Sequence, residues 1–319
     1  MQYLIILLDD TSTSFCHYDI PKDRGQRFID IDDLKKGIRF AMTENLMVQF
    51  VYPEKDLPAS YLDVINSTDH IDIRPYLEDK NEDSDVVVFN ELPLNLMGSN
   101  YPTVVFRLTP QEFFDFPPYL ANEVFDKIER LNIVIRGIDP IQAWDLDRYR
   151  KKLGEMSSWL EKSYIDGKTP QWNILTDRMM LSEMNNCGAG DTTITLAPNG
   201  RFYICPAFYY EDMDDSVGNV HKGLDIPNQY LYKLEHAPIC RHCDAYQCRR
   251  CVWLNRKRTL EVNTPSYEQC VASHLERNTS RNLLLNLQKQ GSFLPDKEIK
   301  EIDYLDPIEN KEQWQQENL

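Results

Sequence analysis

The sequence predicts an α/β protein with a mostly parallel sheet, followed by a small cysteine-rich domain. Two observations support this fold class. Up to about residue 170, short apolar runs alternate with amphipathic segments, as in units that join parallel strands through helices. Further along, seven of the eight cysteines fall between Cys187 and Cys270. Six strands before residue 170 are enough for a partial (β/α)6 barrel, and an open doubly wound sheet fits the alternation as well.

The strands are predicted from continuous apolar runs, which are typical of strands buried on both faces. These runs lie at residues 3–8, 46–52, 71–73, 86–89, 103–108 and 133–135. Helices are expected between them, the first capped by Asp32 and burying Leu34, Ile38 and Met42. Further helices are expected at 58–66 and 119–130, and a long one after Asp139-Pro140.

The C-terminal third is expected to contain one more long helix. Thr264-Pro265 supplies an N-cap and a proline for its first turn, and Gly291 is a suitable C′ residue. We therefore expect a β/α domain at 1–170, a cysteine-rich domain at 171–291 and a polar acidic tail at 292–319.

The cysteines follow a spacing that indicates metal ligation. Twelve residues separate Cys187 from Gly200, and four more separate Gly200 from Cys205. Then comes Cys-x2-Cys-x4-Cys-x2-Cys, formed by Cys240, Cys243, Cys248 and Cys251, and finally Cys270. Thiolates are soft ligands that select zinc, copper(I) or iron–sulfur centres. The Asn199-Gly200 pair between two β-type runs predicts a hairpin with a type I′ turn, which would bring Cys205 back toward Cys187.

Two other roles for these cysteines have to be weighed. Two Cys-x2-Cys pairs can bind one zinc ion, although only four residues separate the pairs here, against about 15–20 in zinc ribbons. Eight cysteines could also form disulfides, which would require an oxidising compartment. The apolar run at the N-terminus is too short for a signal sequence and has no basic residues before it, so we expect a cytoplasmic protein.

The cysteine array resembles the SPASM domain of radical-SAM peptide-modifying enzymes, although two of its spacers are one residue shorter. The resemblance implies a radical-SAM-like barrel and two auxiliary [4Fe–4S] clusters. It also implies the ligand sets: Cys240, Cys243, Cys248 and Cys270 for one cluster, and Cys187, Cys205 and Cys251 for the other. Together with the opening residues Leu7–Tyr18 and the segment Gln49-Phe-Val-Tyr-Pro53, the array resembles the CXXX repeat peptide maturases.

One expected element of radical-SAM chemistry is missing. Those enzymes carry a Cys-x3-Cys-x2-Cys loop after the first strand, where three thiolates hold the cluster that binds S-adenosylmethionine. If Cys16 is the third ligand here, Asp9 and Thr13 stand where the other two should be. Oxygen ligands replace thiolates poorly on iron–sulfur iron. We therefore expect no cleavage of S-adenosylmethionine by this chain, and Cys16, beside His17, is at most a weak candidate for a catalytic residue.

Charge and hydropathy limit the partners. The net charge of −16 repels phosphate backbones, which argues against nucleic acid as a partner. No apolar stretch is long enough to span a membrane.

Three functions remain open at this point. The protein could be a maturase that modifies a short ribosomal precursor peptide, with or without a second maturation protein. It could instead be a non-catalytic peptide-binding partner of a maturase, or a zinc-stapled structural protein.

Overall fold

The computed structural model describes residues 1–12, 15–16, 27–77, 84–92, 101–117, 124, 126, 128–137 and 146–309. Contacts divide the chain into two compact units made of interleaved segments. The first unit comprises 1–110, 134–138 and 188–233, and the second comprises 111–133, 139–187 and 234–319. The expected domains instead follow the chain in order, and that division stays a prediction.

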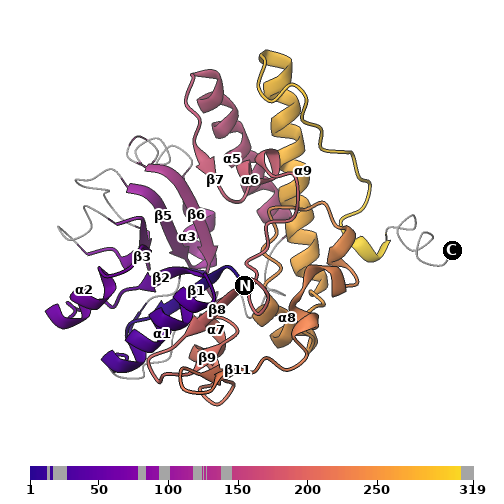
Figure 1. Ribbon diagram of the computed structural model, residues 1–319. Coiled ribbons are helices and arrows are strands. Elements are labelled where there is room, and N and C mark those ends of the chain that lie inside the picture. The colour runs from indigo at the N-terminus through magenta and orange to yellow at the C-terminus, as the bar shows by residue number, and fades with distance from the viewer. Residues whose placement is uncertain are drawn as a thin grey trace. The chain divides into compact units, whose positions relative to one another are not determined.

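The first unit is built on a parallel sheet whose strands follow the order of the chain (Figure 1). The strands β1 (Tyr3–Leu7), β2 (Met47–Val51), β3 (His70–Pro75), β4 (Val86–Phe89) and β5 (Tyr101–Leu108) are neighbours in that sequence. A doubly wound sheet would reverse its order at a switch point. The order seen here is that of a (β/α) barrel.

The other edge of β1 pairs with a strand from much later in the sequence. Strand β8 (Thr193–Leu196) runs parallel to β1, with Tyr3 opposite Thr193. Strand β9 (Phe202–Tyr203) then pairs antiparallel with β8. The predicted hairpin is confirmed, but its turn is not type I′, because Gly200 has a positive φ of 72° and Asn199 does not. Ala197 and Arg201 close a three-residue loop by an N–H to O bond of 3.0 Å.

Helix α1 (Ile31–Thr43) begins two positions earlier than predicted, because its cap is Asp30 and not Asp32. Asp30 is the N-cap, and its carboxylate accepts from the backbone N–H groups of Asp32 and Asp33. With the helix starting there, Leu34 and Ile38 are buried as expected, but Met42 is 70 % exposed and Ala41 takes the inner position. Helix α2 (Ala59–Ile65) lies where a helix was expected.

The predicted helix at 119–130 is wrong at its C-terminal end. Strand β6 (Ile128–Ile135) begins there, and its buried residues alternate with less buried ones, which is the period of a strand. Most of residues 118–127 lie outside the described chain, as does the Asp139-Pro140 start of the long helix. With β6, all six strands expected before residue 170 are present.

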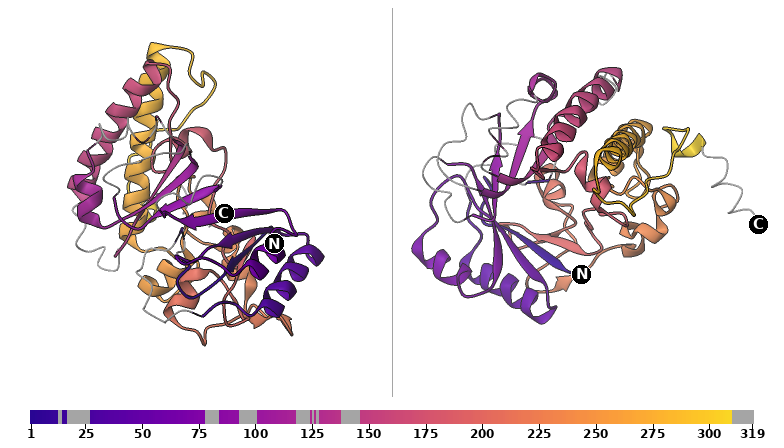
Figure 2. Two further views of the ribbon diagram at one scale, coloured as in Figure 1. Left: turned by 90° about the vertical axis from the view of Figure 1, so that its left-hand side faces the viewer. Right: turned by 90° about the horizontal axis from the view of Figure 1, so that it is seen from above.

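The second unit contains two long helices that pack side by side, α5 (Leu146–Ile165) and α9 (Tyr267–Gln290) (Figures 1 and 2). Helix α9 is capped by Ser266 in a capping box with Gln269, not by Thr264. Gly291 follows its last turn in an extended conformation and not in the left-handed one.

The remaining elements are short. They are α3 (Pro110–Asp115), β7 (Gln171–Trp172), α6 (Thr176–Met180), α7 (Pro206–Glu211), β10 (Gly218–Asn219), β11 (Gly223–Leu224), α8 (Val252–Thr259) and the 3-10 helices η2 (Gln229–Tyr232), η3 (Leu234–His236), η4 (Cys240–His242) and η5 (Pro307–Glu309). Part of the expected tail is ordered against this second unit, since the Arg281 side chain donates to the carbonyl of Ile299 at 3.2 Å. Among the described residues, no helix is long and apolar enough to cross a membrane.

Candidate functional site: a pocket lined by four cysteines

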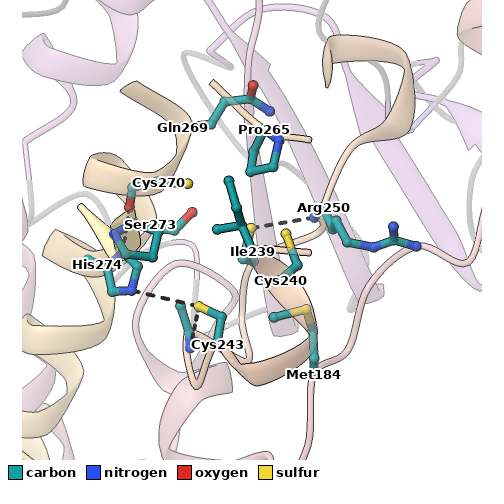
Figure 3. A pocket seen from close by; sticks show the side chains of 13 residues that line it. Met184, Ile239, Cys240, Cys243, Arg250, Pro265, Gln269, Cys270, Ser273 and His274 are labelled. Atoms are coloured by element: carbon teal, nitrogen blue, oxygen red, sulfur yellow. Dashed lines mark hydrogen bonds between the residues drawn. The ribbon is translucent and has the colours of Figure 1, made fainter. Parts of the chain in front are cut away.

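Four of the seven clustered cysteines line one pocket of the second unit, which we call the cysteine pocket: Cys240, Cys243, Cys248 and Cys270. The first two bracket η4, Cys248 lies in the following loop, and Cys270 is in the first turns of α9. Figure 3 shows Cys240, Cys243 and Cys270 on different sides of the pocket. All four carry free thiols. The structure thus brings together the four cysteines that the resemblance to the SPASM domain assigns to one cluster, and their role as its ligands stays a prediction.

The backbone of the cysteine pocket is folded to support thiolates. The N–H of Ala245 donates to Sγ of Cys243 at 3.4 Å, and the N–H of Arg250 donates to Sγ of Cys248 at 3.4 Å. Arg250 has a positive φ of 45°, an uncommon conformation for a residue with a side chain. Hydrogen bonds of this kind favour the charged form of the acceptor.

Burial acts in the opposite direction on the same thiols. It raises the pKa of Cys243 to about 12, and it also raises the pKa values of Cys240, Cys248 and Cys270. The nearby thiols add to the effect, because thiolates so close together repel one another. The thiols are therefore protonated unless a cationic centre replaces their protons, and such binding releases protons.

The positions of the four thiols bear on whether a single metal ion or an iron–sulfur cluster fits the cysteine pocket. Within the described ranges, no group of three or more His, Cys, Asp or Glu side chains is disposed to hold a single metal ion. Four thiols nevertheless surround one pocket, with apolar side chains such as Met184, Ile239 and Pro265 between them. In a [4Fe–4S] cluster each thiolate binds a different iron, so the ligands stand further apart than around one ion. The donor set fits such a cluster.

His274 is a neighbour of this site that the sequence did not reveal. Its Nε2 lies 3.7 Å from Sγ of Cys243, and its Nδ1 lies 2.9 Å from the carbonyl oxygen of Cys270. A carbonyl only accepts, so Nδ1 carries a proton. Burial lowers the pKa of His274. The available signal was its position four residues after Cys270 on a helix, which places both on one face.

The other three cysteines of the array are divided between the two units. The N–H of Cys187 donates to the carbonyl of Arg249 at 3.2 Å, and Cys251 is the N-cap of α8, both in the second unit. Cys205 is the N-cap of α7, in the first unit. The grouping of these three cysteines into a second site therefore stays a prediction.

The loop after β1 is organised by its own polar side chains. Asp9 is buried, and its carboxylate accepts from the N–H of Thr11 at 2.7 Å and from its hydroxyl at 2.8 Å. Ser12 donates through Oγ to the carbonyl of Val51 at 2.8 Å, which fastens the loop to the end of β2. Cys16 is half-buried, whereas Thr13 and His17 lie outside the described residues.

Two tyrosines of α7 donate hydrogen bonds to this loop. The Tyr209 hydroxyl donates to the carboxylate of Asp10, and the Tyr210 hydroxyl donates to the carbonyl of Ser12. Arg27 also pairs with Asp10, at 3.5 Å. Burial raises the pKa of both tyrosines, so they remain neutral donors. These tyrosines directly follow Cys205-Pro206, and no sequence pattern had linked them to the first loop.

Comparison with known proteins finds similarity of fold only. No family model and no curated protein matches the sequence. Solved structures of anSMEcpe do match the fold. One, with AdoMet and the Cp18Cys peptide bound, is 10 % identical, has a TM-score of 0.58, and the match covers 91 % of this chain and 99 % of that one. Another, a histidine-tagged form with AdoMet bound, is 12 % identical, has a TM-score of 0.60 and the same coverage.

At this identity the likeness is one of fold. It confirms the predicted α/β class with a partial barrel, and it extends over nearly the whole chain.

Proposed function

We propose that this protein takes part in the maturation of a ribosomally synthesised cysteine-repeat peptide, using auxiliary [4Fe–4S] clusters and without cleaving S-adenosylmethionine itself. The observation that carries the proposal is the cysteine pocket, four thiols on a radical-SAM/SPASM-like scaffold. A peptide substrate is supported by the fold, since anSMEcpe was solved with peptides bound.

The cysteine pocket would hold one complete cluster, with one thiolate for each iron. Cys187, Cys205 and Cys251 would hold a second cluster and leave one iron without a protein thiolate. When bound, these clusters would supply electron transfer or an iron site for a thiolate of the peptide. Such thiol ligation suits a reducing compartment such as the cytoplasm.

The loop after β1 supports the absence of S-adenosylmethionine cleavage. A cluster open to that molecule needs three thiolates close together, and Cys16 is the only cysteine before Cys187. Asp9, at the position of one missing thiolate, holds its own loop through Thr11. The two tyrosines of α7 hold the same loop from another side.

The same loop favours a second candidate, a non-catalytic partner that binds the precursor peptide for another maturase. The scaffold would then retain peptide recognition, and the clusters would serve stability. The two candidates differ in whether the peptide changes mass.

The experiment begins with anaerobic purification. Iron and acid-labile sulfide in about equal amounts, with a brown colour, would support the clusters; about one zinc and no iron would overturn them in favour of a zinc-stapled structural protein. Incubation of the iron-loaded protein with a cysteine-repeat peptide, followed by mass spectrometry, then tests maturation. An unchanged mass despite binding would favour the non-catalytic partner.

A further inference from the structure

A half-buried carboxylate next to the cysteine pocket holds two arginines. Asp244 directly follows Cys243, and its two oxygens accept from Nε and Nη2 of Arg277 at 3.0 and 2.6 Å. Nη2 of Arg178 donates to the same carboxylate at 3.2 Å. We call these three residues the Asp244 clamp. Because Arg178 is in α6 and Arg277 is in α9, the clamp fastens the Cys243 loop to two helices.

The two arginines of the clamp are buried, whereas the Asp244 side chain is 27 % exposed. The Arg277 side chain is fully buried and that of Arg178 nearly so. The Arg178 guanidinium also lies 4.3 Å from the ring centroid of Tyr246, in the loop between Cys243 and Cys248. Both carboxylate oxygens of Asp244 accept from guanidinium N–H groups, two from Arg277 and one from Arg178, and this paired geometry is that of an ionised carboxylate.

The charges of the clamp do not cancel. Two guanidinium groups meet one carboxylate, and Asp244 is the carboxylate that both arginines contact among the described ion pairs. A surplus positive charge is thus buried beside Cys243. An assembled four-thiolate cluster is an anion, because its thiolates outweigh the charge of its core, and reduction makes it more negative. A buried cation beside the cluster stabilises the reduced form most.

We propose that the Asp244 clamp positions Cys243 and sets the reduction potential of the cluster in the cysteine pocket. The inference rests on the cluster of the proposed function. Arg250 is a further cation at the pocket: its backbone N–H donates to Sγ of Cys248, and its charge acts on Cys240 and Cys248.

Neutralising the anion and neutralising a cation of the clamp should shift the midpoint potential of the cluster in opposite directions. Asp244→Asn removes a negative charge but keeps an acceptor for Arg277, so the midpoint potential should rise. Arg178→Gln removes a positive charge but leaves the paired hydrogen bonds of Arg277, so the potential should fall. A merely structural clamp would instead make both variants lose iron or stability in the same direction. Arg178→Lys keeps the charge and should restore the wild-type potential.

The experiment measures iron per chain and the midpoint potential of the reductively titrated whole protein by electron paramagnetic resonance. Arg150→Gln is the matched control, since it removes one positive charge from an exposed position of α5 and should not shift the potential. Opposite shifts for Asp244→Asn and Arg178→Gln, with iron retained, support the inference. Iron retained with equal or same-direction shifts, or Arg178→Lys behaving like Arg178→Gln, overturns it. A wild-type protein without iron overturns the proposed function and the inference together.

Discussion

Glu276 couples the stability of the second unit to pH. Its carboxylate accepts from the Tyr149 hydroxyl at 2.5 Å and from Nε2 of Gln247 at 3.3 Å, between α9 and α5. Burial raises its pKa from 4.5 to about 7, although these two hydrogen bonds lower it in part. Between those pH values the folded chain keeps a proton that the unfolded chain loses. Raising the pH across this window therefore lowers the free energy of unfolding.

The size of the effect follows from the pKa difference. A pKa raised from 4.5 to about 7 corresponds to roughly 3 kcal/mol once the carboxyl is ionised in both states. This is an upper figure, because part of the Glu276 side chain is exposed. Glu276→Gln removes the ionisation and keeps the shape. Its amide oxygen can accept from Gln247 and its NH2 group can donate to the Tyr149 hydroxyl oxygen.

We expect Glu276→Gln to match the wild type near pH 5 and to be up to about 3 kcal/mol more stable at pH 8. Urea unfolding followed by tryptophan fluorescence at pH 5, 6, 7 and 8 measures this. The difference between variant and wild type removes the contributions of other titrating groups. Glu183→Gln, at an exposed position, is the control, and its difference from the wild type in unfolding free energy should not change with pH. If the difference in unfolding free energy between Glu276→Gln and the wild type also stays constant from pH 5 to pH 8, the reasoning is refuted.

Three further outcomes are expected. Cys243→Ala should lower the unfolding temperature of the iron-loaded protein, because bound metal contributes folding energy, and Cys16→Ala should not; equal losses in thermal scans would contradict this division. Tyr209→Phe should cost about 1–3 kcal/mol in urea unfolding, since it leaves the buried Asp10 without one donor, and an unchanged midpoint would count against that bond. Incubation of the reconstituted protein with S-adenosylmethionine and a strong reductant should give no catalytic 5′-deoxyadenosine by chromatography; its catalytic formation would show that the loop after β1 is misinterpreted.

Much of the fold could be predicted from the sequence because its signals are local. Six short apolar runs gave six strands, and Pro58 preceded a helix as expected. Errors came where two local signals competed. Ile128 continues the helical spacing of Val124 but also begins the period-two pattern of β6, and packing in the sheet decided between them. Thr264-Pro265 and Ser266 both offer caps, and the capping box with Gln269 decided in favour of Ser266.

The candidate site was predictable in part for the same reason. Cysteine spacing indicated metal ligation by the array, and the resemblance to the SPASM domain implied the grouping of the four cysteines that line the cysteine pocket. Contacts between residues far apart in sequence gave no such signal. Asp244 is next to a cysteine, but nothing in the sequence pairs it with Arg178 or Arg277. The bonds from Tyr209 and Tyr210 to the first loop join positions about two hundred residues apart, which only the folded chain brings together.

The pairing of β8 with β1 has a consequence for how the chain is made. One edge of β1 is covered by β2, which follows soon after it, but the other edge waits for β8, which ends at Leu196. During synthesis the strands that precede β8 would thus emerge with one edge of β1 open to other chains. A fragment that stops at residue 170 lacks β8, so this edge of β1 stays unpaired. We expect such a fragment to aggregate, whereas in one that extends through β9 the edge of β1 is covered by β8.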